Sequence, residues 1–216
     1  MTLKRIEEEL KKQDFRVTIF GSARIRENDQ KYKQIHDLGK QIGNKGWDIV
    51  TGGGPGLMKA ANTGHKSAKP DGKRGHSIGL GIKLPHEQDA NTGVEFFKEF
   101  RLFTDRLDDF MLLSNAIVVT SGGIGTVLEL FYTWQLMQVK HACHIPVILL
   151  GEMWPPLIKW VENHPLKNKY LGKEDMHLLF LAKDNKEVMK VLDKAHNHFI
   201  EGKKDFCTNY KQYKIK

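Results

Sequence analysis

A glycine-rich turn followed by a carboxylate is the feature of this sequence best suited to chemistry. The segment SGGIGTVLEL (121–130) directly follows the apolar run AIVVT (116–120), and Thr126 stands where a helix is expected to begin. The glycines of the turn are Gly122, Gly123 and Gly125. Such glycines free the backbone to present several N–H donors to one anion, as a phosphate monoester requires. We predict that the turn holds a phosphate, with Glu129 placed to act on the group that the phosphate carries.

The same residues also fit a purely structural role. Thr126 and Glu129 have the T-x-x-E spacing of a capping box, in which the glutamate bonds back to the amide of the N-cap residue. On the residues alone, the cap and the functional carboxylate both stay open.

A second glycine turn, TGGGPGLM (51–58), joins an expected strand to an expected helix. Its glycines allow close approach of an anion, and we expect Gly53 and Gly54 to contact a ligand. The turn is not a dinucleotide fingerprint, because Leu57 stands where the third glycine would be, and no GK[ST] of a Walker A loop follows. A tight strand–helix connection without a ligand is the alternative.

Strand-like and helix-like segments alternate along the chain. Strands are expected at 15–21, 47–54, 75–85, 96–104, 116–120 and 145–151, and helices at 32–46, 55–68, 105–115, 125–140, 154–165 and 186–200. This alternation predicts an α/β fold, a Rossmann-like doubly wound parallel sheet flanked by helices on both faces. We expect a single domain over 1–216, with an N-terminal helical extension (1–14) and a basic C-terminal tail (203–216).

Ligands of such sheets bind at the carboxyl ends of the strands. Three turns are expected at that edge, FGSAR (20–24), TGGGPG (51–56) and TSGGIGT (120–126), and each combines glycine with small hydroxyl residues. Ser22, in the first of them, is either a ligand contact or a turn residue.

Composition narrows the function classes without choosing among them. The net charge of +8 suits anionic ligands, although a lysine-rich surface is the simpler explanation, so nucleic acid is possible but not favoured. Cys143 and Cys207 lack metal-ligand or CxxC spacing, which indicates neither a zinc site nor a disulfide framework. With no signal-peptide pattern or membrane-length apolar run, we expect a cytoplasmic protein that needs no metal or other cofactor.

The two glycine turns together resemble a known family. TGGGPGLMKAAN (51–62) resembles the GGGxxGxMxAAN segment, and SGGIGTVLE (121–129) the PGGxGTxxE signature, of the LONELY GUY family. FGSAR and GIKLPHEQ (81–88) add to a likeness that covers roughly residues 15–163. The resemblance implies a Rossmann-like fold and a homodimer or higher homo-oligomer with its site near the interface. The short apolar runs, for their part, predict no membrane association. The resemblance also implies hydrolysis of a nucleoside 5′-monophosphate, AMP-like or a cytokinin riboside 5′-monophosphate, to free base and ribose 5-phosphate.

The resemblance also assigns roles to residues. Gly122, Gly123, Gly125 and Thr126 would cradle the 5′-phosphate, Glu129 would be the essential carboxylate, and Arg106 would be the essential arginine. Without the resemblance, Arg106 reads as a surface partner of the aspartates around it in FTDRLDDF (103–110). Two positions depart from the family pattern: Leu107 replaces the lysine that follows the arginine, and Ser121 replaces the proline that opens the signature.

Three functions are therefore open. Hydrolysis of the N-glycosidic bond is the leading hypothesis, in which Glu129 stabilises an oxocarbenium-like sugar or activates water and Arg106 acts electrostatically. Leu107 and Ser121 favour the second, a protein that binds a nucleotide or another phosphorylated ligand without hydrolysing it. Single-stranded nucleic-acid binding is third. Members of the family have also been described as lysine decarboxylases, but the sequence offers no Schiff-base lysine in a cofactor-binding setting.

Overall fold

The computed structural model describes residues 12, 14–83 and 89–202. Its strands are β1 (Arg16–Phe20), β2 (Asp48–Thr51), β3 (Ser77–Ile82), β4 (Phe96–Phe100), β5 (Ala116–Val119), β6 (Val147–Leu150) and β7 (Leu179–Ala182). Its α-helices are α2 (Gln30–Asn44), α3 (Leu57–Lys66), α4 (Phe103–Leu113), α5 (Ile124–Gln138), α6 (Trp154–Val161) and α7 (Asn185–Ile200). A π-helical turn (Glu162–Leu166) follows α6, and a 3₁₀ helix (Glu174–Leu178) precedes β7. The predicted tail (203–216) and nearly all of the predicted N-terminal extension (1–14) lie outside the described residues.

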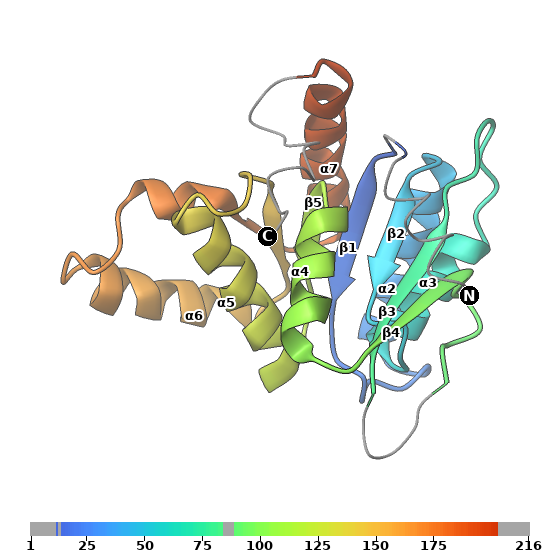
Figure 1. The fold of residues 1–216 in the computed structure, drawn as a ribbon, viewed down its shortest axis with the longest axis horizontal. Helices are drawn as coiled ribbons and strands as arrows, with labels where there is room; N and C mark the ends of the chain where they lie inside the picture. Colours follow the sequence, from blue (N-terminus) through green and yellow to red (C-terminus); the bar gives the residue numbers. More distant parts are fainter. Residues whose placement is uncertain (1–11, 13, 84–88, 203–216) are drawn as a thin grey trace.

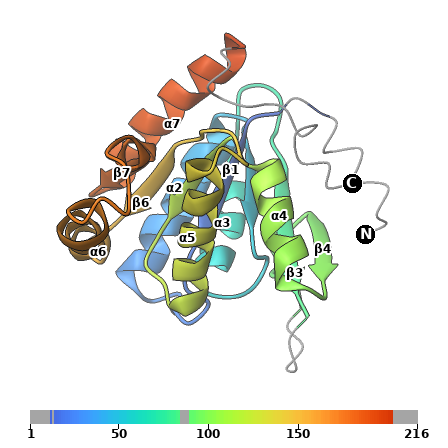
Figure 2. The ribbon, with the colours of Figure 1, turned by 60° about the vertical axis from the view of Figure 1, so that its left-hand side comes forward.

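All neighbouring strands of the described sheet pair in parallel, in the order β4-β3-β2-β1-β5-β6-β7. Helices cover both of its faces (Figures 1 and 2). One core layer joins the sheet to α2, α3 and α7, and the other joins it to α4, α5 and α6. The structure therefore confirms the predicted Rossmann-like doubly wound α/β fold.

The central strands are buried on both faces, as parallel sheets between helices require. In β5, Ala116 and Val118 pack into the layer of α2, α3 and α7, whereas Ile117 and Val119 pack into the opposite layer. The strand period of two thus turns a continuous apolar run into two core surfaces.

Helix α2 shows how local signals set the boundaries of an element. The carboxylate of Asp29 caps its start by accepting a hydrogen bond from the amide of Lys31 at 2.7 Å. Ile35, Leu38 and Ile42 form its buried stripe. Gly46, with a φ of +72°, ends the segment in the left-handed region that favours glycine, as the sequence predicted.

Two elements differ from the prediction. The expected strand 96–104 ends at Phe100, and α4 begins at Phe103. The side chains of Leu102 and Phe103 are exposed, so this part of the apolar run does not mark a buried strand. Strand β7 was not predicted. It is a short edge strand whose Phe180 and Leu181 are exposed, so it lacks the continuous apolar signal of the central strands.

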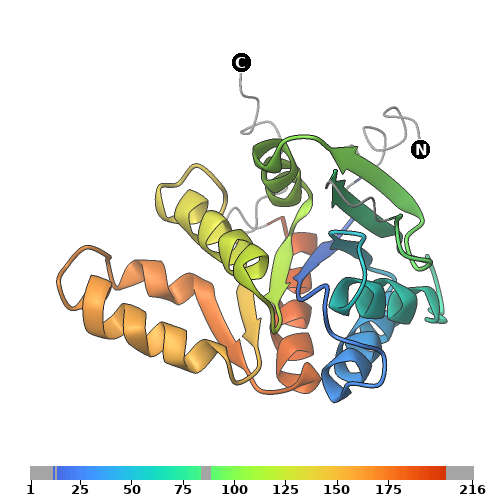
Figure 3. The same cartoon turned by 90° about the horizontal axis from the view of Figure 1, so that it is seen from below.

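From β1 to β4 successive strands are added toward one edge of the sheet, and from β5 to β7 toward the other. The boundary between β1 and β5 is therefore the topological switch point. The arrow of β1 points downward in Figure 1, so Figure 3, seen from below, looks onto the edge where the carboxyl ends of the strands lie. The turns after β1, β2 and β5 meet at this edge: the amide of Ser22 donates to the carbonyl of Ser121 at 3.0 Å, and the amide of Leu57 donates to the carbonyl of Ser22 at 2.9 Å.

Two observations bear on the expected environment of the protein. Every helix in the described ranges is too short or too polar to cross a bilayer. Cys143 is disulfide-bonded, which corrects the expectation drawn from cysteine spacing. The cytoplasmic location, which relied partly on that expectation, stays a prediction.

Candidate active site

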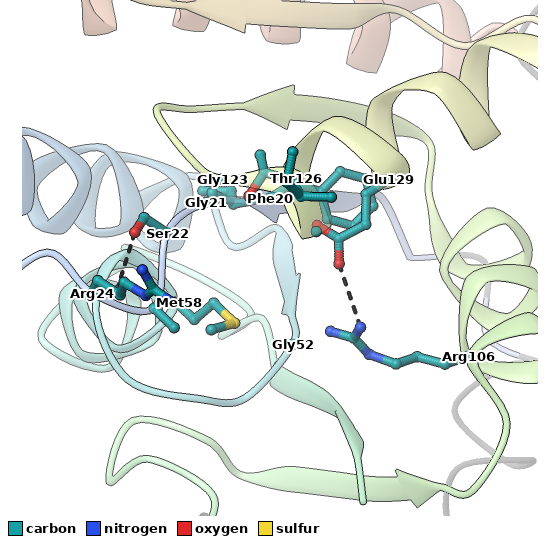
Figure 4. A pocket seen from close by; sticks show the side chains of 14 residues that line it. Phe20, Gly21, Ser22, Arg24, Gly52, Met58, Arg106, Gly123, Thr126 and Glu129 are labelled. Atoms are coloured by element: carbon teal, nitrogen blue, oxygen red, sulfur yellow. Dashed lines mark hydrogen bonds and ion pairs between the residues drawn. The ribbon is translucent and has the colours of Figure 1, made fainter. Parts of the chain in front are cut away.

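A cavity of about 550 Å³ opens at the switch point. The turn after β1, the two glycine turns and one side chain of α4 enclose it (Figure 4). Its lining residues are Ile19, Phe20, Gly21, Ser22, Ala23, Arg24, Gly52, Met58, Arg106, Gly123, Ile124, Gly125, Thr126 and Glu129. The cavity therefore brings together most of the residues that the sequence singled out: Ser22, Arg106, Gly123, Gly125, Thr126 and Glu129.

The start of α5 tests the capping-box interpretation of Thr126 and Glu129. Gly123 is the N-cap of this helix and no side chain caps it, so Thr126 is the third helical residue and Glu129 the sixth. The first helical hydrogen bond runs from the amide of Val127 to the carbonyl of Gly123, at 3.0 Å. The capping-box interpretation is therefore wrong. The amides of residues 124–126 precede that bond, at the positive end of the helix dipole and beside the cavity.

The glycines of this turn divide into two kinds. A Cβ built on Gly123 or Gly125 meets no atom within 4 Å, and both residues line the cavity. Gly122 is different, because its Cβ would lie 2.1 Å from the hydroxyl oxygen of Thr126 and its amide faces the sulfur of Met153 at 3.4 Å. Gly123 and Gly125 thus leave open space next to the backbone donors, whereas Gly122 lets the turn close on Thr126.

Arg106 of α4 and Glu129 of α5 point toward each other on one side of the cavity (Figure 4). Their Nη1 and Oε1 atoms are 3.5 Å apart, and their side chains are only 10% and 12% exposed. The Nε of Arg106 donates to the carbonyl of Leu80 at 2.8 Å, and its guanidinium lies 5.0 Å from the ring centroid of Phe110. The surface role considered for Arg106 is therefore wrong.

Burial shifts the ionisation of this pair. It raises the pKa of Glu129 to about 7, because a desolvated carboxylate resists ionisation, and the nearby charge of Arg106 offsets part of that rise. Burial also lowers the pKa of Arg106, with Glu129 acting in the opposite direction. A carboxylate with a pKa near 7 can accept or release a proton at neutral pH, which suits a general base.

The second glycine turn contributes Gly52 to the cavity, whereas Gly53 and Gly54 are not among the described lining residues. The side-chain amide of Asn91 holds both of their carbonyls, at 3.0 Å for Gly53 and 2.9 Å for Gly54. A Cβ on Gly52 would come within 2.5 Å of Nη2 of Arg106, so glycine is needed there for the arginine to reach the cavity. The ligand contacts expected of Gly53 and Gly54 stay predictions.

Ser22 combines the two roles that the sequence left open. It lines the cavity, and its hydroxyl accepts a hydrogen bond from the amide of Arg24 at 3.1 Å. Sequence reasoning missed Arg24, Gly52 and Met58 as lining residues. Arg24 belongs to the FGSAR turn that the sequence placed at this edge, so its position was the available signal.

Neither of the two residues that depart from the family pattern lines the cavity. Leu107 is 5% exposed and is not among the residues that line the cavity. Ser121 lines a separate cavity of about 230 Å³. Within the described residues, no cluster of three histidine, cysteine, aspartate or glutamate side chains could hold a metal ion.

The fold and the site define a Rossmann-like α/β protein with a glycine-rich turn that lines a cavity at its switch point. The family model described as "Possible lysine decarboxylase" matches residues 58–192. The chain belongs to this family, which confirms the resemblance to the LONELY GUY proteins.

Among curated proteins, the chain is similar to pyrimidine/purine nucleotide 5′-monophosphate nucleosidase of Escherichia coli strain K12. The two are 29% identical over 140 residues, which is 62% of this chain and 30% of that protein. The match thus spans less than a third of the relative's length. The proteins of the same name from two other Escherichia coli strains match to the same extent.

Solved structures share the fold. The molybdenum cofactor binding protein of Rippkaea orientalis has a TM-score of 0.63 at 20% identity, covering 84% of this chain and 96% of its own. The molybdenum cofactor carrier protein of Chlamydomonas reinhardtii has a TM-score of 0.60 at 25% identity, covering 85% and 99%. DNA processing protein A of Helicobacter pylori, whose structure concerns single-stranded DNA binding, has a TM-score of 0.52 at 15% identity, covering 86% and 83%.

Proposed function

We propose that this chain hydrolyses the N-glycosidic bond of a nucleoside 5′-monophosphate, giving free base and ribose 5-phosphate. The observation that carries the proposal is that the Arg106–Glu129 pair and the open start of α5 line the same cavity. The similarity to a nucleotide 5′-monophosphate nucleosidase supports it.

The chemistry follows from the charges of the cavity. When the C1′–N bond breaks, the sugar becomes oxocarbenium-like and the base leaves with the electron pair. Ionised Glu129 stabilises that cation and takes a proton from the attacking water, which bonds to C1′. Arg106 stabilises the negative charge that develops on the leaving base. The base then takes up the proton that Glu129 received from the water, which returns Glu129 to its ionised form.

The phosphate supplies binding energy away from the reacting bond. The amides at the start of α5 and the hydroxyl of Thr126 would hold it, with the helix dipole favouring its negative charge. That grip orients the glycosidic bond against Glu129. We propose an AMP-like or cytokinin riboside 5′-monophosphate as substrate.

A second candidate is a carrier that binds a phosphorylated ligand without cleaving it. The molybdenum cofactor carrier of Chlamydomonas reinhardtii, 25% identical over 85% of this chain, favours it. The DNA-binding neighbour is only 15% identical and shows the fold alone, so nucleic-acid binding gains no support from it.

The test is a panel of nucleoside monophosphates: AMP, GMP, IMP, CMP, UMP and N6-isopentenyl AMP. Free base is measured by chromatography for the wild type and for Glu129→Gln. Base release by the wild type alone supports hydrolysis and ranks the bases. No release from any nucleotide, combined with a rise in melting temperature on adding AMP, would favour the carrier.

A further inference from the structure

The cavity has two cationic side chains, and one of them is already paired. Arg106 lies against Glu129, with 3.5 Å between Nη1 and Oε1. The other is Arg24, whose guanidinium has no ion pair or hydrogen bond within the part of the chain that the structure describes. Arg24 is therefore the cation of the cavity that is available to a ligand.

The backbone that carries Arg24 is fixed. Its amide donates to the hydroxyl of Ser22 at 3.1 Å. The amide of Ser22 donates to the carbonyl of Ser121, in the glycine turn before α5, at 3.0 Å. The carbonyl of Ser22 accepts from the amide of Leu57, at the start of α3, at 2.9 Å. Figure 4 shows Ser22 and Arg24 on one side of the cavity, and Arg106 with Glu129 beside it on the other side.

A phosphate monoester carries close to two negative charges at neutral pH, and neutral amides alone balance them poorly. The amides at the start of α5 and the hydroxyl of Thr126 supply hydrogen-bond donors but no full positive charge. A guanidinium adds charge together with a planar pair of donors that matches two phosphate oxygens.

We propose that Arg24 binds the 5′-phosphate and makes this site selective for nucleotides over nucleosides. The inference rests on the proposed function and specifies how the substrate lies. The phosphate occupies the side of Ser22 and Arg24, beside the start of α5, and the glycosidic bond lies at the side of Glu129. In the family pattern a lysine follows the essential arginine, but here that position is Leu107, which is buried and does not line the cavity. The positive charge for the phosphate is therefore supplied by Arg24, in the turn after β1.

The kinetic test compares AMP with adenosine for the wild type, Arg24→Gln, Arg24→Lys and Arg26→Gln. Arg26 is the matched control, because it lies in the same exposed turn, does not line the cavity and has no ion pair among the described residues. In Arg24→Gln we expect KM for AMP to rise by roughly 10- to 100-fold, the range of a lost charge-assisted hydrogen bond. Activity on adenosine should be unchanged, Arg24→Lys should recover part of the loss, and Arg26→Gln should behave as the wild type.

A binding measurement separates this inference from the proposed activity. Titration calorimetry with ribose 5-phosphate gives a Kd whether or not any nucleotide is cleaved. We expect Arg24→Gln to weaken this binding by at least about 10-fold and Arg26→Gln to leave it unchanged. Equal Kd values for all variants, or no binding by the wild type, would overturn the role of Arg24. Absence of base release alone would sink only the hydrolase.

Discussion

At the scale of single residues, the account depends on the ionisation of one carboxylate. Glu129 has its pKa raised to about 7 by burial, with Arg106 holding it below what burial alone would give. A buried carboxylate beside a single cation can serve as a base at neutral pH, and it becomes protonated when the pH falls slightly below neutral.

The first prediction is a pH profile. In the proposed mechanism the ionised form of Glu129 is the active one, so kcat should rise with pH and level off above an apparent pKa of about 7. The measurement is kcat for AMP hydrolysis between pH 5 and 9, with circular dichroism confirming that the fold persists. A rate that stays flat down to pH 5 would show that another group sets the chemistry.

The second prediction concerns the partner of that carboxylate. Replacing Arg106 by Gln removes the charge that favours ionised Glu129, so the midpoint of the pH profile should move upward. The plateau of kcat should also fall, by on the order of 10²-fold or more, since stabilisation of the leaving base is lost. Arg101→Gln is the control, because this exposed arginine has no partner among the described residues and does not line the cavity. An unchanged midpoint in Arg106→Gln would contradict the pairing.

The third prediction follows from linkage. The pKa of Glu129 rises from 4.5, the ordinary value, to about 7 in the folded chain, so the folded state holds its proton more tightly than the unfolded chain. The stability that this provides is fully present below pH 4.5 and is lost as the pH rises through about 7. Relative to Glu129→Gln, the melting temperature of the wild type should therefore fall between pH 5 and 8. A difference that does not change with pH would count against a raised pKa.

At the scale of elements, the open start of α5 is the feature on which the proposed phosphate binding depends. Gly123 caps the helix without a side chain, and the cavity meets its first free amides. Gly125 and Gly122 should respond differently to replacement by alanine, because a Cβ on Gly125 would face open space and one on Gly122 would meet Thr126.

The fourth prediction uses that contrast. Gly125→Ala should leave the melting temperature equal or higher, since alanine favours a helix over glycine, while the methyl group interferes with phosphate binding and raises Kd for ribose 5-phosphate. Gly122→Ala should destabilise the fold by about 1–3 kcal/mol, because its Cβ would overlap the side chain of Thr126. Thermal melts and calorimetry on both variants test this. Equal effects on stability would contradict the assigned geometry.

The sequence predicted the fold and much of the site because strong local signals coincide there. Buried strands, glycine turns and the switch-point rule placed Ser22, Gly123 and Thr126 at one edge without any coordinates. The pairing of Arg106 with Glu129 required the family resemblance, since a helix rich in aspartate gives arginine an equally plausible local partner. Only the three-dimensional arrangement shows that Gly52, rather than Gly53 or Gly54, lines the cavity.

At the scale of the whole molecule, the outer face of α5 has no covering element in the described structure. Its residues Ile124, Leu128 and Phe131 are exposed by 86%, 45% and 37%, and Ile124 also lines the cavity. The homodimer that the family resemblance implies would cover such a face next to the site, and it stays a prediction.

The fifth prediction tests that assembly. The full chain, with a mass of 24.8 kDa, should elute at twice that mass or more in size-exclusion chromatography with light scattering. Leu128→Asp should shift it toward the monomer, because a charge would be buried in the contact. Ile200→Asp, which alters an exposed apolar residue of α7 in the opposite helix layer, is the control. A monomeric wild type at all concentrations would refute the assembly.

The central claim is that the Arg106–Glu129 cavity hydrolyses a nucleotide at its glycosidic bond. Its most direct test is a product balance for the full chain incubated with AMP at pH 8, where Glu129 is mostly ionised. We predict adenine and ribose 5-phosphate in equal amounts from the wild type and neither from Glu129→Gln, with both proteins folded. Undiminished products from Glu129→Gln, or no product from the wild type with any nucleoside monophosphate, would contradict the claim.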